Sequence, residues 1–329
     1  MLVFVTGATG FVGGHAVSRL LADGHEVRCL VRDLGRAPSN LRAPGIDLFQ
    51  GDLSNANLLA AGMAGCEALV HLGGVNSHWE RRRARYREVN VDGVRNVMTA
   101  ALQSKLRVAV NIGTALAWGR TETVPFNEET PPGHEKYSDY ARSKFLGDRV
   151  AWRLHRDSGL PLVSIYPGGV MGPGNSKQTA LYFHTILEGK MPGLLFPDAR
   201  QTCIAVDDVA AMISRALITP EAIGRKYLGG GETLSTTDLN NLLVELAGAK
   251  LPRWRIPDFA LHGASVLATK LADVTKREPM LGLARASMRH LAAGCEFDGS
   301  RAVRELGITY TPMRETIAAE LASYEPRPA

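Results

Sequence analysis

The sequence predicts a doubly wound α/β fold, in which helices cover both faces of a parallel sheet. Three observations predict it. Apolar runs of roughly five residues alternate with segments of helical periodicity through the first half of the 329-residue chain. A glycine-rich turn joins the first apolar run to the first helical segment. The composition, with 45% hydrophobic and 22% charged residues, is that of a globular protein.

The elements of this first half alternate strictly. Each expected strand is a short apolar run, at 2–6, 26–31, 46–50, 68–72, 108–113 and 161–166. Apolar residues recur at helical spacing in 11–22, 55–64, 84–103 and 138–156. Strands separated by helices require right-handed crossovers and a parallel sheet, so the fold class follows from the order of the elements.

The pattern loosens after Tyr166. Gly/Pro-rich stretches cover 167–174 and 189–197, and helical periodicity returns at 206–217 and 235–246. We expect residues 1–170 to form the sheet domain, with segments around 200–230 returning to it, and residues 171–329 to form mainly a smaller lobe. Because ligands of open α/β sheets bind beyond the carboxyl ends of the strands, we expect this lobe to hold the substrate.

Charge and composition exclude several classes of protein. The 38 Lys and Arg exceed the 33 Asp and Glu by five, which is too small a surplus for a nucleic-acid-binding domain. No apolar stretch is long enough to span a membrane. The chain begins directly with a strand, so we expect no targeting presequence and a cytoplasmic protein. Four widely spaced cysteines fit buried thiols in a reducing compartment, at Cys29, Cys66, Cys203 and Cys295.

One dense basic cluster stands out, at Arg81, Arg82, Arg83, Arg85 and Arg87. We interpret it as the solvated start of a helix; the alternative is a pocket rim that attracts an anionic substrate. No group of His, Cys or carboxylate residues has the spacing of metal ligands, so no catalytic metal is expected.

A glycine motif lies between the first strand and the first helix. Gly7, Gly10 and Gly13 are spaced GxxGxxG. Gly7 and Gly10 would allow a tight turn and the close approach of a pyrophosphate, and Gly13 would let the helix pack on the sheet. The helix N-terminus offers free N–H groups and the positive end of its dipole. The motif therefore predicts a dinucleotide site.

The second strand ends in Arg32 and Asp33, where the adenosine ribose should lie. An Arg there accommodates a 2′-phosphate, whereas an acidic residue grips a 2′-hydroxyl. Because Arg32 comes first, we predict NADP(H), with Arg36 as a second phosphate contact and NAD(H) as the alternative. Asp52, after the third strand, is placed to accept a hydrogen bond from the adenine; the alternative is a cap in a polar turn.

A candidate catalytic group follows in the segment Tyr140 to Lys144. Residues four apart share one face of a helix, and a lysine ammonium beside a phenol lowers the phenol pKa from its usual value near 10. Thr114 ends the preceding strand, so its hydroxyl can orient a substrate carbonyl while Tyr140 protonates it. The alternative for Thr114 is a hydrogen bond to the local backbone.

With these motifs the chain resembles the extended short-chain dehydrogenase/reductases, a Rossmann-fold family, over essentially its full length. The matching segments are 7–13, 71–74, 90–93, 114–119, Tyr140 with Lys144, Pro167 with 172–174, and 206–209. Within the family it is most similar to the dihydroflavonol 4-reductase and 3β-hydroxysteroid dehydrogenase branch, including bacterial members described as hopanoid-associated sugar epimerases.

The resemblance implies an NAD(P)-dependent oxidoreductase with a YxxxK motif that acts on CH–OH groups. It implies Tyr140 as general acid/base, Lys144 as its activator and ribose ligand, and Thr114 as the residue that orients the carbonyl. The cofactor would contact Gly7, Thr9, Gly10, Phe11, Val12, Arg32, Asp52, Leu53, Leu72, Gly73, Gly74, Ile112, Tyr140, Lys144, Pro167, Gly168, Gly169 and Val170.

The sequence departs from the family pattern at three places. Thr114 replaces a serine, and Gly73 and Gly74 replace alanines, which we expect to widen the pocket. Epimerases of the family commonly carry an Arg five residues before the Val of their Val-Asp-Asp stretch to hold a diphosphate. Counted from Val206, that position is Gln201.

Three hypotheses remain. The first is an NADP(H)-dependent reductase of a ketone or aldehyde, or dehydrogenase of the alcohol, on a medium-sized and largely apolar substrate. The second is a nucleotide-sugar epimerase or dehydratase that recycles its NAD(P) internally, and the third is a non-catalytic dinucleotide sensor. The expected partner is a small carbonyl or alcohol compound, with no nucleic acid and no membrane span. The chain is either a monomer or a homodimer.

The loops after the fourth and sixth expected strands should surround the reacting carbon. They carry His78 and Trp79, and Met171, Tyr182 and Phe183. We expect a bulky, partly aromatic pocket there. His78 is interpreted as a solvent-exposed or backbone-bonded side chain, not as a second acid.

Overall fold

A computed structural model describes residues 1–175, 178–279 and 282–324. Its larger sheet has seven parallel strands in the order β3-β2-β1-β4-β5-β6-β9. These strands are β1 (Leu2–Thr6), β2 (Glu26–Val31), β3 (Ile46–Gln50), β4 (Ala68–His71), β5 (Val108–Ile112), β6 (Leu162–Pro167) and β9 (Lys226–Gly229). The predicted doubly wound Rossmann-like fold is confirmed.

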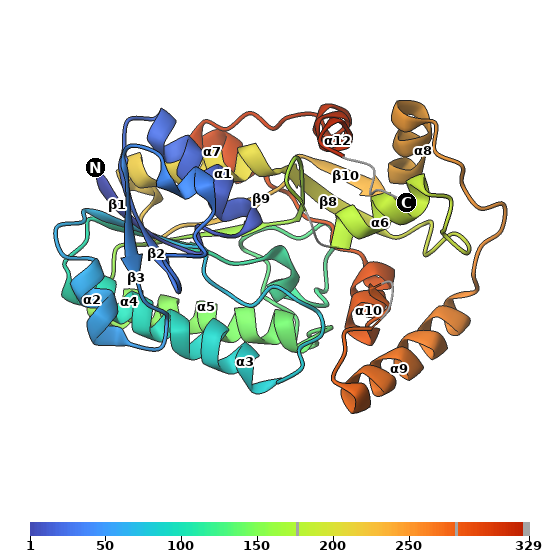
Figure 1. Cartoon of the computed structure of the whole chain (residues 1–329), viewed down its shortest axis with the longest axis horizontal. Coiled ribbons are helices and arrows are strands. Elements are labelled where there is room, and N and C mark those ends of the chain that lie inside the picture. The colour runs from blue at the N-terminus through green and yellow to red at the C-terminus, as the bar shows by residue number, and fades with distance from the viewer. Residues whose placement is uncertain (176–177, 280–281, 325–329) are drawn as a thin grey trace.

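Helices cover the sheet on both faces (Figure 1). On one face α1 (Phe11–Ala22) and α7 (Val206–Ile218) pack on the strands, burying Val17 and Met212 against Val3 and Val5. On the other face lie α2 (Ala56–Gly62), α4 (Val94–Gln103) and α5 (Asp139–Ser158). A parallel strand that is buried on both sides needs a layer of helices on each face of the sheet, and these helices supply the two layers.

The segment predicted as one helix at 84–103 is divided. It comprises α3 (Ala84–Arg87), a π-helical turn (Glu88–Gly93) and α4. The π-helical turn widens the helix where it meets α5, and such turns are frequent at functional sites. Short 3₁₀ helices occupy Ser39–Arg42, Ala115–Trp118 and Pro220–Ala222.

A three-stranded sheet forms the centre of the second lobe, in the order β10-β8-β7. Its strands are β7 (Gly169–Met171), β8 (Arg200–Ala205) and β10 (Glu232–Ser235). Around it lie α6 (Gln178–Leu187), α8 (Thr236–Ala247), α9 (Asp258–Thr275), α10 (Arg285–Ala293) and α12 (Met313–Ala322), whereas α11 (Ser300–Leu306) packs into the core of the larger sheet. In Figure 1, α9 and α10 project from the body as a helical pair.

Segments far along the chain return to the first sheet. In the sequence, α7 and β9 lie between the lobe strands β8 and β10. In the fold, α7 packs on α1 and β9 pairs with β6. Within the described residues, no helix has the length and apolar character needed to cross a membrane.

Candidate active site

The glycine motif forms a tight loop between β1 and α1. Gly7 has φ +78°, and a Cβ there would lie 2.6 Å from the Leu72 carbonyl carbon, so only glycine fits. A Cβ on Gly13 would overlap the Gly7 carbonyl oxygen. Gly10 precedes α1 without any side-chain cap, which leaves first-turn N–H groups available. This backbone cradle fits the pyrophosphate of a dinucleotide. Thr9 and Gly10 are exposed, and Phe11 and Val12 are half-buried.

At the end of β2 the two competing side chains behave differently. Asp33 turns back on its own loop, where its Oδ1 accepts a hydrogen bond from the Gly35 N–H at 2.8 Å. Arg32 is exposed, and its positive charge acts on Asp52. Asp52 in turn accepts hydrogen bonds from the Ser54 hydroxyl at 2.5 Å and the Ser54 N–H at 2.8 Å, and these bonds lower its pKa. Asp52 thus caps a polar turn while remaining exposed beside Arg32.

The segment after β4 packs against the glycine loop between β1 and α1. A Cβ on Gly73 would lie 3.0 Å from the Thr6 Oγ1 and 3.1 Å from the Leu53 side chain, and one on Gly74 would lie 3.1 Å from the Asn90 Oδ1. A methyl group at either position would make a tight contact with its neighbours, so the two glycines permit close packing here. Their effect on the width of the pocket stays a prediction.

Tyr140 and Thr114 meet at the carboxyl end of β5. Tyr140 lies in the first turn of α5, and Thr114 lies two residues after the end of β5 and caps the 3₁₀ helix Ala115–Trp118. Both are buried, with 7% and 8% of their surface exposed. Burial raises the pKa of Tyr140 to about 12, and a hydrogen bond from Thr114 opposes this rise. The two hydroxyls can therefore address one substrate oxygen.

Lys144 lies one turn after Tyr140 on the same helix. Its Nζ donates a hydrogen bond to the Ile112 carbonyl oxygen at 2.6 Å, which holds the ammonium at the end of β5. Burial lowers the Lys144 pKa to about 8, and the carboxylate of Asp148 opposes this shift. A lysine with such a pKa remains largely protonated at neutral pH and can support a phenolate.

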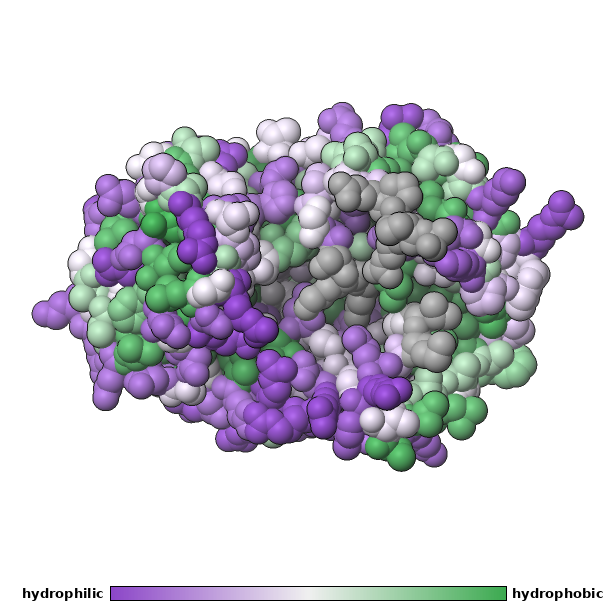
Figure 2. Space-filling view, viewed as in Figure 1, coloured by the Kyte–Doolittle hydropathy of each residue, from purple (hydrophilic) through white to green (hydrophobic). Residues whose placement is uncertain are grey.

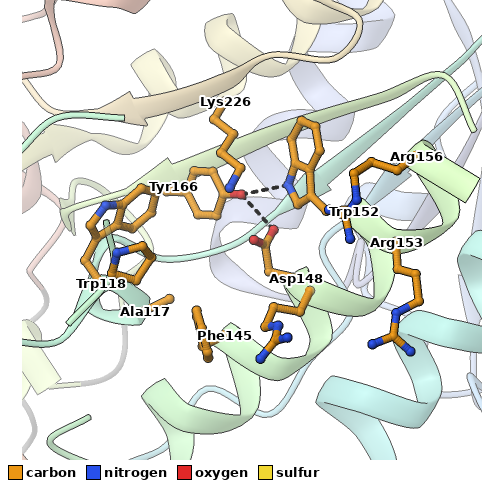
Figure 3. Close-up of a pocket in the computed structure, with 11 residues that line it drawn as sticks. Ala117, Trp118, Phe145, Asp148, Trp152, Arg153, Arg156, Tyr166 and Lys226 are labelled. Carbon is orange, nitrogen blue, oxygen red and sulfur yellow. Dashed lines mark hydrogen bonds between the residues drawn. The ribbon is translucent and has the colours of Figure 1, made fainter. Parts of the chain in front are cut away.

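Asp148 anchors α5 to strand β6 of the sheet. Figure 3 shows its carboxylate beneath the Tyr166 hydroxyl, which donates a hydrogen bond at 2.7 Å, while the Trp152 indole N–H donates to Tyr166 at 3.1 Å. Burial raises the Asp148 pKa, and Lys226 and Lys144 oppose this rise. The network fixes the rotation of α5 about its axis.

Asn90 in the π-helical turn is a site residue whose role the sequence did not predict. Its Oδ1 accepts from the Val75 N–H at 2.8 Å, and its Nδ2 donates to the Val75 carbonyl at 3.0 Å and to the Ser143 hydroxyl at 2.9 Å. Gly147 lets α5 approach the Asn90 backbone closely. Asn90 thus connects the loop after β4 to the helix that carries Tyr140. Its place in the segment Asn90 to Gly93, a family landmark, was the available signal.

Two histidines cover Tyr140. The His78 ring stands edge-on to the Tyr140 ring, with centroids 5.7 Å apart, and lies 4.8 Å from the His290 ring. His78 is half-buried rather than solvent-exposed, because the lobe helix α10 brings His290 over it. Burial lowers the His290 pKa to about 3, and its Nε2 shares a hydrogen bond of 2.8 Å with the Ser138 hydroxyl.

The expected aromatic pocket is only partly present. Met171 and Phe183 lie in the core of the lobe, packed with Leu243 and Met313. The Tyr182 hydroxyl donates to Asn240 at 2.6 Å. Apolar side chains do surround Tyr140, but these are Val75, Tyr86, Val89 and Leu116. Trp79 instead reaches α9, where its indole N–H donates to Asp273 at 3.0 Å.

The chain crosses from the first sheet to the lobe at 167–170. Pro167 ends β6, and a Cβ on Gly168 would overlap the Thr202 carbonyl oxygen. Gly169 and Val170 begin β7, which pairs with β8.

Four of the five arginines in the basic cluster at 81–87 bind carboxylates at the surface. The pairs are Arg82 with Glu88, Arg83 with Asp273, Arg85 with Glu80 and Arg87 with Asp92. These ion pairs fit the interpretation of a solvated helix start.

Three relatives with assigned names match most of the chain. A protein of Synechocystis sp. with the provisional name dihydroflavonol 4-reductase is 28% identical, covering 96% of this chain and 92% of the relative. Sterol demethylase protein B of Methylococcus capsulatus is 29% identical, covering 99% of both. A 3-beta-hydroxysteroid dehydrogenase of Mycolicibacterium neoaurum is 28% identical, covering 80% and 74%.

Solved structures show the same fold. The crystal structure of gox2253 is 30% identical, with a TM-score of 0.82, and the match covers 98% of this chain and 97% of that one. The Bordetella bronchiseptica enzyme WbmG in complex with NAD is 20% identical, with a TM-score of 0.77 and coverage of 98% and 94%. At that identity the second likeness supports the fold alone.

The family profile agrees with the site geometry. It matches residues 3–228, which include the glycine loop, Thr114, Tyr140 and Lys144. The named dehydrogenases and reductases among the relatives make this chain an NAD(P)-dependent oxidoreductase. The chain belongs to the NAD dependent epimerase/dehydratase family, the extended short-chain dehydrogenase/reductases.

Proposed function

We propose that this protein is an NADP(H)-dependent oxidoreductase that reduces a ketone or aldehyde, or oxidises the corresponding alcohol, of a medium-sized and largely apolar substrate. One observation carries the proposal. The hydroxyls of Tyr140 and Thr114 lie together in a buried site, one helical turn from the Lys144 ammonium. This arrangement can deliver a proton to a carbonyl oxygen and hold that oxygen in place.

The proton moves through side chains of α5. Thr114 donates a hydrogen bond that orients the substrate oxygen, and Tyr140 gives its phenolic proton as that oxygen gains charge. Burial opposes the phenolate that results, because it raises the Tyr140 pKa to about 12. The Lys144 ammonium stabilises the phenolate when it swings from the Ile112 carbonyl towards Tyr140.

The edge formed by the ends of β1, β2, β4 and β5 would hold the dinucleotide. The pyrophosphate would lie on the loop of Gly7 and Gly10, the adenosine ribose beside Arg32, and the nicotinamide near Pro167. Bound nicotinamide supplies the hydride. Residues 1–170 would then be the cofactor domain, with 200–230 returning to it, and residues 171–329 mainly the substrate lobe.

NADP(H) is favoured over NAD(H) by the contrast between Arg32 and Asp33. The Asp33 Oδ1 is engaged by Gly35 within its own loop. Arg32 is exposed at the sheet edge, where a guanidinium can bind a 2′-phosphate in a bidentate manner.

The reductase is favoured over the epimerase by the substrate side of the site. Gln201 stands where family epimerases carry their diphosphate-binding Arg, and the neighbouring Arg200 binds Glu296 at 2.9 Å. The side chains around Tyr140 are apolar, which suits a hydrocarbon-rich substrate better than a nucleotide sugar. Relatives named as reductases of oxoalkanoates and of a farnesyl-bearing quinoline oxide support the same class.

Replacement of Tyr140 by Phe tests the proposal. Turnover of NADPH with a panel of apolar ketones and aldehydes should fall by at least about 100-fold, since general acid catalysis contributes that much. NADPH affinity, measured by fluorescence titration, should stay unchanged. Tyr137→Phe, three residues earlier, is the matched control and should keep full activity. Near-normal turnover in Tyr140→Phe would refute the mechanism.

Nucleotide that remains bound through purification, with no net consumption of NADPH, would instead support internal recycling and the epimerase hypothesis. The absorbance of the freshly purified protein distinguishes the two outcomes before any substrate is added.

A further inference from the structure

Helix α9 presents an apolar face to solvent. Phe259, Leu267, Leu271 and Val274 are 80%, 69%, 64% and 80% exposed. With Gly263 they follow one another at steps of four or three residues, so they lie on one side of the helix. The opposite side packs into the lobe through Leu261, Ser265 and Ala272. Figure 2 shows hydrophobic residues gathered over α9, at the lower right of the view.

This face lies within a basic part of the chain. Residues 250–289 carry eight Lys and Arg against three Asp and Glu, an excess of five that equals the net charge of the whole protein. Two of the three acids are engaged, since Asp258 binds Arg255 and Asp273 binds Arg83. Exposed cations border the apolar row, at Lys270, Lys276 and Arg277.

We propose that the exposed face of α9 docks on an anionic lipid bilayer. An amphipathic helix with apolar residues on one side and cations beside them lies in the membrane interface, where apolar burial and attraction to anionic headgroups act together. A second copy of the chain fits this face less well. A two-fold interface would set the same net positive patch against itself.

The docking face is connected to the active site through α10. The Thr269 hydroxyl of α9 accepts a hydrogen bond from the Arg285 N–H at the start of α10. From α10, His290 reaches Ser138 and His78 above Tyr140. A cavity of about 630 Å³ separates the two helices on the docking side, lined by His262, Gly263, Val266, Leu267, Arg285 and Arg289.

This cavity gives a route for an apolar compound from the lipid to the space between α9 and α10. This route rests on the proposed function, because it requires an apolar substrate. The docking itself does not, because it follows from the exposed surface of α9 alone. The experiment therefore measures binding without substrate or cofactor.

The full-length protein is mixed with vesicles of equal parts phosphatidylglycerol and phosphatidylcholine, and with vesicles of phosphatidylcholine alone, and the bound fraction is measured by sedimentation. Binding is expected to the anionic vesicles and to weaken with added salt. Leu271→Ser should weaken it about tenfold, the effect of withdrawing one large apolar side chain from the interface. Lys270→Gln should weaken it about fivefold.

Two matched controls use exposed residues elsewhere. Ile218→Ser at the end of α7 and Lys105→Gln after α4 remove similar groups from the sheet domain and should leave binding unchanged. Absence of binding to anionic vesicles, or equal losses in the controls, would overturn the proposal. Dimerisation in analytical ultracentrifugation that Leu271→Ser abolishes, without vesicle binding, would assign the face to a second copy and also overturn it.

Discussion

At the end of β2, two adjacent side chains of opposite charge lie in different surroundings. The Asp33 Oδ1 accepts a hydrogen bond from the Gly35 N–H, whereas Arg32 is exposed at the sheet edge. Charge-assisted hydrogen bonds contribute about 1.5–3 kcal/mol. We therefore expect Arg32→Gln to weaken NADPH binding about 10- to 100-fold and to leave NADH binding nearly unchanged, as measured by fluorescence titration with each nucleotide.

Arg36→Gln is the companion variant, because Arg36 is an exposed cation on the same loop. A smaller loss of NADPH affinity there would agree with a second phosphate contact. Equal losses of NADPH and NADH affinity in Arg32→Gln would contradict the assignment of the 2′-phosphate to Arg32.

Single residues also mark how far the sequence predicts the site. Tyr140 and Lys144 lie on one helix, so their spacing alone predicts their shared face. His78 and His290 are separated by more than half of the chain, and their contact depends on where α10 lies over the sheet domain. No local pattern encodes that placement. The close neighbours of Gly73 could not be predicted from the sequence for the same reason, because Thr6 and Leu53 belong to other segments of the chain.

Among the elements, α5 carries both Tyr140 and Lys144, and its first turn is capped by one residue. The Ser138 hydroxyl accepts the Ala141 N–H at 3.1 Å as the helix N-cap and also bonds His290 of α10 at 2.8 Å. Ser138→Ala should lower the free energy of unfolding by about 1 kcal/mol through the lost cap. It should also lower kcat, because Tyr140 lies in the first turn and the α10 contact is lost.

Ser235→Ala provides the comparison, because Ser235 caps α8 in the lobe with a capping box. Chemical denaturation should show a similar loss of stability, and steady-state kinetics should show no change in kcat. If Ser138→Ala lowers stability without any effect on kcat, the cap does not determine the position of the first turn of α5.

The same distinction between local and distant information applies to the elements. Six of the seven strands of the large sheet were predicted closely because each is a short apolar run next to a helix, whereas β9 was not predicted as a strand. The strands β7 and β10 have three and four residues and no apolar run, and they form only by pairing with β8. The π-helical turn at Glu88–Gly93 follows from the approach of α5 at Gly147, which helical periodicity does not reveal.

At the scale of the whole molecule, the helices α11 and α12 contribute to two different cores. Ala302 and Leu306 of α11 lie in the core of the large sheet, and Met313 and Ile317 of α12 lie in the core of the lobe. From α12, Glu320 accepts a hydrogen bond from the Gly172 N–H at 2.7 Å, just after β7. Burial raises the pKa of this carboxyl from 4.5 to about 7.

This raised pKa makes stability depend on pH in a definite direction. Between pH 4.5 and 7 the folded protein holds a proton on Glu320 that the unfolded chain has released, so the free energy of unfolding falls as pH rises through this range. At ~1.4 kcal/mol for each unit of pKa, the fall amounts to ~3 kcal/mol.

Glu320→Gln keeps an acceptor for Gly172 but cannot ionise, so this contribution to the pH dependence should vanish. Denaturation in urea at several pH values measures it: the variant should match the parent near pH 4.5 and exceed it by ~3 kcal/mol near pH 8. Glu315→Gln, an exposed position on the same helix, should follow the parent at every pH. Parallel curves for Glu320→Gln and the parent would show that Glu320 is ionised in the fold and that its bond to Gly172 is a charged one.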